Sequence, residues 1–131
     1  MANPNIAAVT AIYGTTTYYT PTGTTAVVLL PNAAASGTVL KINQIVAANV
    51  NGSAAVNATV SLYTNGAVAQ GSAPSSGTAY PIVSTVSVPA NASLIVADKT
   101  TAIYLMEGTS ITVTSGTASG ITYSISYEVI S

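Results

Sequence analysis

Charged side chains are scarce in this chain of 131 residues, which has two lysines, three acidic residues and a net charge of −1. They make up 4% of the sequence, against about 25% in ordinary soluble domains. Two lysines cannot neutralise the row of phosphates on which sequence-independent nucleic-acid binding depends, and they cannot form a polybasic membrane anchor. The composition therefore excludes nucleic acid and a membrane surface as partners.

Histidine, cysteine, tryptophan and arginine are absent. Without histidine and cysteine the chain has no imidazole triad, no thiol nucleophile and no disulfide. A carboxylate pair remains possible, as in glycoside hydrolysis, and Asp98 and Glu107 are the candidates. No arginine, histidine or tryptophan is available as a second shell to bind a sugar or tune a carboxyl pKa, so we predict no catalytic residues and no enzymatic activity. Asp98 is instead expected to cap a bulge or pair with Lys99, and Glu107 to lie on an exposed turn.

The same shortage bears on metal binding. Zinc sites are built mainly from cysteine and histidine, neither of which is present. Calcium takes about six or more oxygen ligands, which three scattered acidic residues do not supply. We therefore expect no metal ion and no cofactor.

Long apolar runs are also missing. The longest, such as Ala26–Leu30, are far shorter than the ~20 residues of a membrane-spanning helix. The start of the chain, MANPNIAAVTAIYG, has neither the basic region nor the continuous apolar region of a secretory signal. A soluble surface with so little charge gives little protection against association. We therefore expect neighbouring subunits to cover much of it, in a homo-oligomer or a larger assembly.

Short runs of β-branched, aliphatic and tyrosine residues are what the chain contains instead. About nine of them recur at a spacing of ~8–12 residues, with no convincing helix. This pattern predicts an all-β fold, a single antiparallel β-sandwich domain over residues 1–131 that is jelly-roll-like, with residues 1–5 as a flexible N-terminal arm. The expected strands are Ile6–Ile12, Thr15–Tyr19 as an edge strand, Thr24–Leu30, Val39–Val50, Val56–Tyr63, Pro81–Val88, Leu94–Asp98 continued after a kink by Ala102–Leu105, Ser110–Ser115 and Ile121–Ile130.

Turn residues predict how these strands connect. Pro31 is expected to end its strand, and Asn51-Gly52 favours a type I′ hairpin between the two strands beside it. The segment Asn65–Thr78 is long for a β-connection, so it is a candidate for contact with an outside partner, with a short hairpin at Ala67–Gln70. The alternation before Asn51 places on one face Leu40, Ile42, Val46, Ala48 and Val50.

Four residues are candidates for a subunit interface. Lys41 and Glu128 lie in strands, either paired across a sheet or a subunit boundary or solvated separately. Tyr18 and Tyr19 lie in a threonine-rich edge segment, where tyrosine offers a large contact area with a polar tip. Two later tyrosines fall on the apolar face of the last strand and are expected in the core, Tyr123 and Tyr127.

Several stretches of the sequence resemble those of a known group of proteins. They are the start MANPNI, the segment Val39-Leu40-Lys41-Ile42-Asn43, the run STVSVPANASLIVADKTTAIYLMEGTSITV and the ending Ser126-Tyr127-Glu128. In these the chain resembles small virion structural proteins of tailed phages that infect marine bacteria and cyanobacteria. The resemblance spans most of the chain and is loose outside these motifs. It carries over no site residues.

The resemblance implies a non-enzymatic capsid decoration (cement) protein that binds the outer head surface and stabilises the shell. Its expected partners are further copies of the chain, with a trimer favoured, and the major capsid protein or another virion protein. We expect assembly into the virion in the host cytoplasm. The alternatives are a phage tail or fibre subunit used in host attachment, and a bacterial surface adhesin or filament subunit that pairs through an edge strand.

Overall fold

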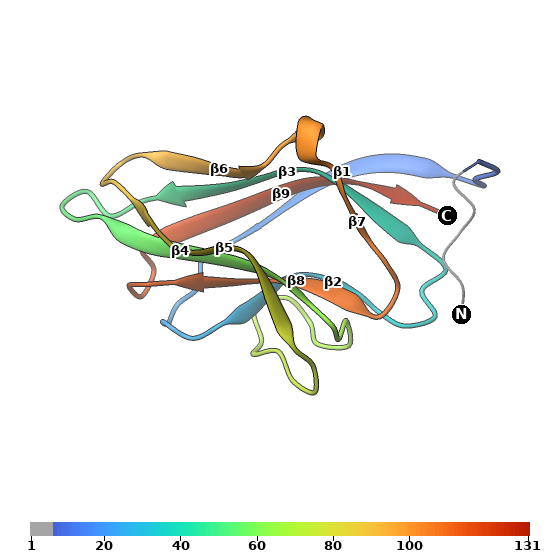
Figure 1. The fold of residues 1–131 in the computed structure, drawn as a ribbon, viewed down its shortest axis with the longest axis horizontal. Coiled ribbons are helices and arrows are strands. Elements are labelled where there is room, and N and C mark those ends of the chain that lie inside the picture. Colours follow the sequence, from blue (N-terminus) through green and yellow to red (C-terminus); the bar gives the residue numbers. More distant parts are fainter. Residues whose placement is uncertain (1–6) are drawn as a thin grey trace.

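The computed structural model describes residues 7–131, which form two antiparallel β-sheets packed face to face (Figure 1). The alternation of apolar and polar residues along each run gives a strand one face to bury, and two such sheets bury their faces against each other. In chain order the strands are β1 (Ile12–Tyr19), β2 (Val27–Asn32), β3 (Val39–Asn49), β4 (Val56–Tyr63), β5 (Ala79–Val88), β6 (Ser93–Ala97), β7 (Ile103–Leu105), β8 (Thr109–Ser115) and β9 (Ile121–Ile130).

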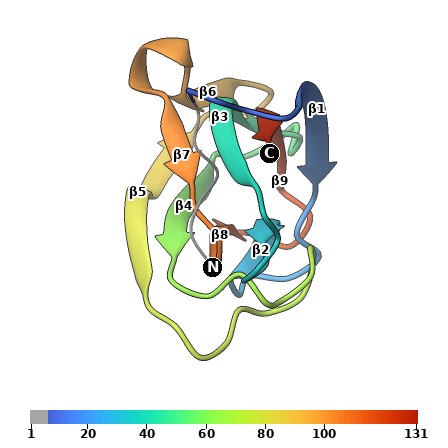
Figure 2. The same ribbon diagram turned by 90° about the vertical axis from the view of Figure 1, so that its right-hand side faces the viewer.

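The strand order is that of a jelly roll. Sheet A has the order β1-β9-β3-β6, with β7 also paired to β3, and sheet B has the order β2-β8-β4-β5. β6 and β7 pair with successive parts of β3 and so act as one strand interrupted by a 3₁₀ turn, η1 (Lys99–Thr101). In Figure 2, β1 and β5 lie at opposite margins of the sandwich. The predicted all-β, jelly-roll-like sandwich of about nine strands is confirmed.

The predicted hairpin at Asn51-Gly52 is wrong. β3 belongs to sheet A and β4 to sheet B, so this turn carries the chain from one sheet to the other. Asn51 Oδ1 accepts a bond from the Ser53 amide at 3.0 Å, which closes the local turn. Among the described strands, β4 and β5 are the only consecutive pair hydrogen-bonded to each other. Turn residues therefore marked where the chain reverses, but not which strands pair.

The first strand also differs from the prediction of Ile6–Ile12. Ile6 and the predicted arm at residues 1–5 lie outside the described residues, residues 7–11 are not a strand, and β1 begins at Ile12. The amides of Thr10 and Ala11 both donate to the carbonyl of Ser131, which holds this segment to the end of the chain. The prediction of an edge strand at Thr15–Tyr19 is confirmed, because that run lies within β1 at the margin of sheet A.

Pro31 does not end its strand as predicted. β2 runs through it to Asn32, and Pro31 pairs with Ser110 of β8. β2 is an edge strand of sheet B, so the missing proline N–H can face away from the ladder. A proline in this position costs no hydrogen bond of the sheet.

A β-bulge in β3 changes which residues face the core. The register of β3 against β9 shifts between Ile42 and Gln44. A bulge adds one residue to one strand, so the alternation after it is reversed. Ile42 is buried before the bulge, and Ile45, Ala47 and Asn49 are buried after it. The predicted common face is therefore correct for Leu40 and Ile42 and wrong for the residues after the bulge, Val46, Ala48 and Val50.

The core lies between the two sheets and contains no charged side chain among the described residues. Tyr123 is the largest fully buried residue, and its hydroxyl donates to the carbonyl of Thr114. Burial raises the pKa of Tyr123 to about 12. The prediction of a core position is confirmed for Tyr123, while Tyr127 is partly buried and packs against the core. The other fully buried large side chains include Leu29, Ile42, Ile45, Leu105, Ile111, Ile121 and Ile125.

The loop between β4 and β5 is fixed to its own chain. The Gly71 amide donates to the Val28 carbonyl at 2.8 Å, and the Val28 amide donates to the Ser72 carbonyl at 2.9 Å. Gln70 Nε2 donates to Leu29 O at 2.9 Å and to Thr17 Oγ1 at 3.0 Å. The predicted short hairpin at Ala67–Gln70 is wrong, since these residues form no strand.

This loop also covers part of sheet B. Gly66 lies so close to β2 that a Cβ there would stand 2.2 Å from the carbonyl oxygen of Asn32. The hydroxyl of Tyr63 accepts a bond from the Gly77 amide, and Ser110 Oγ donates to the Asn65 carbonyl. Tyr63 and Ser110 are therefore buried at this end of sheet B. The loop acts as an internal cover, and its role in binding a partner stays a prediction.

Asn49 provides a test of how buried polar side chains hold the connections between sheets. Its side chain is 3% exposed, donates to the carbonyls of Val88 at 2.8 Å and Ala54 at 3.0 Å, and accepts from the Asn51 amide. Asn49→Ala leaves these groups without partners, the buried carbonyl of Val88 among them, and should lower the free energy of unfolding by about 2–3 kcal/mol in urea titrations. The matched control, exposed Asn57→Ala in β4, should change it by less than about 0.5 kcal/mol. Equal losses in both variants would contradict this role.

Candidate functional site

The outer face of sheet A, the side turned away from sheet B, carries exposed side chains on several of its strands. Its strands present hydroxyl and amide side chains in rows across the sheet. In one row Thr16, Ser126 and Gln44 lie opposite one another, and Thr16 Oγ1 lies 2.9 Å from Ser126 Oγ. The next row runs across four strands through Tyr18, Ser124, Val46 and Ile95.

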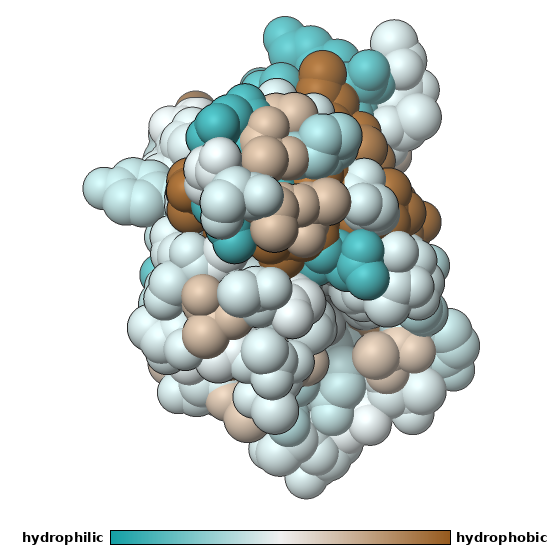
Figure 3. Space-filling view, turned by 90° about the vertical axis from the view of Figure 1, so that its left-hand side faces the viewer, coloured by the Kyte–Doolittle hydropathy of each residue, from teal (hydrophilic) through white to brown (hydrophobic). Residues whose placement is uncertain are grey.

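Exposed apolar side chains accompany these rows. On sheet A the exposed fraction is 71% for Tyr18, 59% for Ile95 and 47% for Tyr104. Figure 3 views one end of the sandwich, and the hydrophobic residues gather over its upper half, on the side of sheet A. The lower half, on the side of sheet B, is mostly pale and weakly polar. The outer face of sheet A therefore combines neutral polar groups with exposed apolar ones, as protein interfaces do.

Lys41 and Glu128 form a pair on this face. They lie directly opposite each other on β3 and β9, with 3.7 Å between Lys41 Nζ and Glu128 Oε2. Their side chains are 37% and 35% exposed, so the pair adds at most about 1 kcal/mol to stability. The predicted pairing across a sheet is confirmed, within one subunit. Because the two charges offset each other, they leave the face nearly neutral.

The two candidate tyrosines of β1 point in opposite directions. Tyr18 pairs with Ser124 on the outer face of sheet A, whereas Tyr19 pairs with the buried Tyr123. Tyr19 packs against the core, and its ring is about 3.1 Å from where a Cβ of Gly71 would stand. Of the pair, Tyr18 is thus the residue available to a partner. Contact of Tyr18, Tyr19, Lys41 or Glu128 with another subunit stays a prediction.

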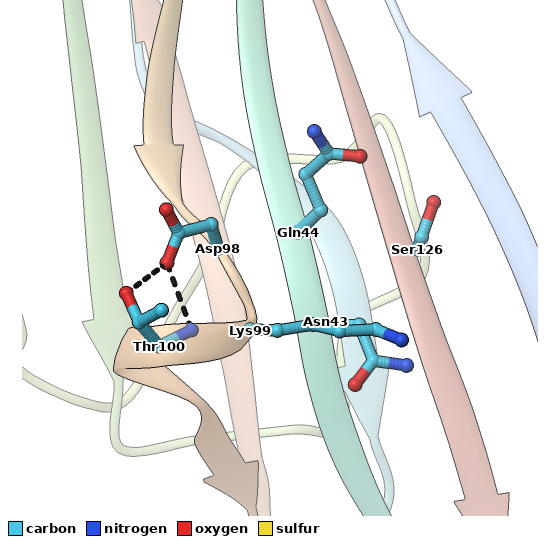
Figure 4. Close-up of a pocket in the computed structure, with 6 residues that line it drawn as sticks. All are labelled: Asn43, Gln44, Asp98, Lys99, Thr100 and Ser126. Carbon is cyan, nitrogen blue, oxygen red and sulfur yellow. Dashed lines mark hydrogen bonds between the residues drawn. The ribbon is translucent and has the colours of Figure 1, made fainter.

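A hollow of about 500 Å³ opens on the outer face of sheet A beside η1. β7 pairs with β3 up to Ile42 and β6 pairs with it from Ile45 onward, so the interruption between β6 and β7 faces the bulge of β3. The hollow lies at this interruption (Figure 4) and is lined by Asn43, Gln44, Asp98, Lys99, Thr100 and Ser126. Its amide, hydroxyl and charged groups can donate and accept hydrogen bonds.

Asp98 has a structural role at the rim of this hollow. Its carboxylate accepts bonds from the amide and the hydroxyl of Thr100, and Thr101 completes the cap of η1. The hydrogen bonds from Thr100 lower the pKa of Asp98 below its usual value of 3.8. In Figure 4 the Lys99 side chain points away from Asp98, and no salt bridge joins the two within the described residues. The prediction that Asp98 caps the bulge is confirmed.

Glu107 lies elsewhere, and the prediction that it lies on an exposed turn is wrong. It is partly buried, and its Oε1 accepts a bond of 2.8 Å from the Gly37 amide, which joins the β7–β8 turn to the β2–β3 loop. Glu107 does not line the hollow that contains Asp98, so the two candidate carboxylates do not converge there. Residues 7–131 contain no cluster of three or more potential metal ligands and no helix long and apolar enough to cross a membrane.

Sequence reasoning found the kink at Lys99-Thr100-Thr101 but missed the hollow beside it. The hollow depends on Asn43 and Gln44, which are far from the kink in sequence and reach it only because β3 bulges there. An asparagine-glutamine pair inside an apolar strand is the one local signal of this bulge.

Comparison with protein families, curated proteins and solved structures gives no match to this chain.

The cap of η1 gives a prediction about pH. The pKa of Asp98 in the folded chain is lowered, so its stabilising contribution is present above pH 3.8 and is lost as the pH falls through the lower, folded value. In Thr100→Val the hydroxyl is replaced by a methyl group of similar size, and the pKa of Asp98 should rise toward 3.8. An NMR titration of the Asp98 carboxyl carbon measures both values. An unchanged pKa in Thr100→Val would show that the hydroxyl does not stabilise the carboxylate.

Proposed function

We propose that this chain is a non-enzymatic structural subunit of a phage virion, and specifically a decoration protein of the capsid. The observation that carries the proposal is the outer face of sheet A, a neutral surface of hydroxyl, amide and exposed apolar groups that no loop of the described chain covers. Its rows of small side chains on paired strands suit burial against a second regular protein surface. The resemblance of the sequence to small phage virion proteins supports the same assignment.

The charge balance of this face also supports a structural role. The Lys41–Glu128 ion pair on this face offsets its own charges, so contacts made by the face depend mainly on apolar burial and neutral hydrogen bonds. Such contacts are hardly screened by salt. Repeated by symmetry over a shell, many modest contacts of this kind reinforce it without any chemical step. A jelly-roll fold alone does not carry the proposal, because the same fold serves many functions.

A tail or fibre subunit used in host attachment is the second candidate, and the hollow beside η1 favours it. The side chains of Asn43, Gln44 and Asp98 present the donors and acceptors that bind sugar hydroxyls. Tyr104, exposed on β7, supplies an aromatic surface on the same sheet. In this role the hollow would contact a receptor glycan, and only a few copies would be present at the tail.

The two roles are separated by where the chain lies on intact particles. Electron cryomicroscopy of virions that carry it should show density over the outer head surface, at a copy number set by the symmetry of the capsid. Density confined to the tail would reject decoration in favour of the fibre role. Absence of the chain from purified particles would reject both.

A pair of variants tests the proposed binding face. Ile95→Glu places a charge on the outer face of sheet A, and should reduce binding to heads assembled without the chain by about tenfold or more, which corresponds to about 1.4 kcal/mol. The control, Ser87→Glu, places the same charge on exposed β5 of sheet B and should bind as the unchanged chain does. Equal binding of the two variants would contradict docking through sheet A.

A further inference from the structure

The two sheets of the sandwich have four edges in the described chain. Sheet A ends at β1 on one side and at β6–β7 on the other, and sheet B ends at β2 and β5. An edge strand presents unpaired backbone N–H and C=O groups to which a further strand can add. Natural proteins therefore interrupt or cover their edges, and three of these four edges show such protection.

The edge of β2 is covered by the chain itself. Both the amide and the carbonyl of Val28 are bonded to the β4–β5 loop, through Ser72 and Gly71 respectively. Gln70 of the same loop also bonds the carbonyl of Leu29. Pro31 removes one donor farther along this edge. β2 therefore cannot accept another strand without displacing the loop.

The edges at β5 and β6–β7 are interrupted. β5 contains Pro81, its register against β4 shifts twice, and Thr85 has a φ of 49°, which is rare for a β-branched residue and marks a bulge. The edge at β6–β7 is broken by η1, which Asp98 caps. Neither edge offers a continuous ladder of backbone groups.

The backbone of β1 shows none of these protections, since the bond that Gln70 of the β4–β5 loop donates to β1 goes to the side-chain hydroxyl of Thr17. It pairs with β9 through eight consecutive residues with no register shift, and it contains no proline and no charged residue. Within residues 7–131 it pairs with β9 alone, and Figure 2 shows no strand beyond it. Six of its residues are exposed and the other two partly buried. β1 is thus the one open edge in the described part of the chain.

Gly14 is an independent sign that another backbone approaches β1. Glycine in a strand interior is unfavourable, and it often marks a place where a second backbone comes close. The fold of the single chain does not require it, since Gly14 has no positive φ and an added Cβ would come no nearer than 4.0 Å to any atom, the Tyr127 carbonyl oxygen. Glycine at this position fits an approach from outside the chain.

We propose that β1 pairs antiparallel with β1 of a second copy of this chain, about a two-fold axis, and joins the two A sheets into one. The identity of the partner follows from which sheet edges are open. A head-to-tail ring needs a second open edge that differs from β1, and the described residues offer none, so β1 has only itself to pair with. Because β1 has no charge, self-pairing brings no like charges together. A two-fold dimer takes the place of the trimer that the sequence favours.

The side chains of β1 select a register for this pairing. In a continuous sheet, residues that lie opposite each other must point to the same face. The two-fold axis therefore lies between one residue and its own copy in the partner strand, and not between two neighbouring positions along the strand. With the axis at Thr16, Thr16 lies opposite its own copy on the outer face, and Tyr18 lies opposite Gly14. The Tyr18 ring can then cover the strand at glycine, as aromatic residues do beside edge glycines. On the inner face Thr15 lies opposite Thr17, a favourable cross-strand pair.

The absence of cysteine makes the register testable with a single substitution. Thr16→Cys places two thiols opposite each other across the axis. Directly opposite residues of antiparallel strands have Cα atoms about 4.5–5.5 Å apart, which lies within the range of a disulfide. Under mild oxidation the folded variant should form a disulfide-linked dimer on non-reducing gels. The control Ser93→Cys, exposed on β6 at the other edge of sheet A, should stay mostly monomeric. Equal cross-linking of both variants overturns the pairing.

The mass of the purified chain in solution provides the second readout, and it does not depend on the virion role. Sedimentation equilibrium should show a dimer of the unchanged chain. Thr16→Lys, at an exposed residue, places two ammonium groups against each other and should weaken dimerisation by about tenfold or more. Ser93→Lys should leave it unchanged. A monomer or a trimer for the unchanged chain overturns the proposal, as does an undiminished dimer in Thr16→Lys.

Discussion

In a sandwich of two open sheets, the edge strands have unpaired backbone N–H and C=O groups that must be covered or kept from pairing with other chains. The rest of this structure is arranged around that constraint. The long loop between β4 and β5 lies against the β2 edge through Gly71 and Ser72. Pro81 and the bulge at Thr85 interrupt β5, and the capped 3₁₀ turn interrupts β6–β7. These devices use loops, turns and bulges where most proteins also use charge. Within residues 7–131, one edge, β1, remains open.

The shortage of charge determines what the surfaces can do. Two of the chain's charges meet in the Lys41–Glu128 pair, and the carboxylates of Asp98 and Glu107 are occupied by hydrogen bonds to the chain's own backbone. Four of the five charged side chains therefore contact the chain itself, and the fifth, Lys99, lines the hollow beside η1. Of the open surfaces, the edge of β1 has no charged residue, and the charges on the outer face of sheet A balance, with two lysines and two carboxylates. Both suit burial against protein, which is the common basis of the proposed virion role and of the proposed dimer.

The sequence predicted the fold class and most strands, because alternation and turn residues are local signals. It did not predict which strands pair, since the Asn51-Gly52 turn has the same local chemistry whether it closes a hairpin or crosses between sheets. It also missed the bulge after Ile42, where one added residue reverses the faces of β3. At the candidate interface, the Lys41–Glu128 pair was foreseen as one of two alternatives. The separate environments of Tyr18 and Tyr19 depend on tertiary packing.

Amide hydrogen exchange of β1, measured over a range of protein concentrations, tests most directly whether its open edge is a pairing surface. At low concentration, the amides of β1 that point away from β9 should exchange rapidly. They should become protected as the concentration rises, while the edge amides of β5 and β6 keep the same rates. Rates in β1 that do not depend on concentration, or protection that appears at the other edges instead, would contradict the account.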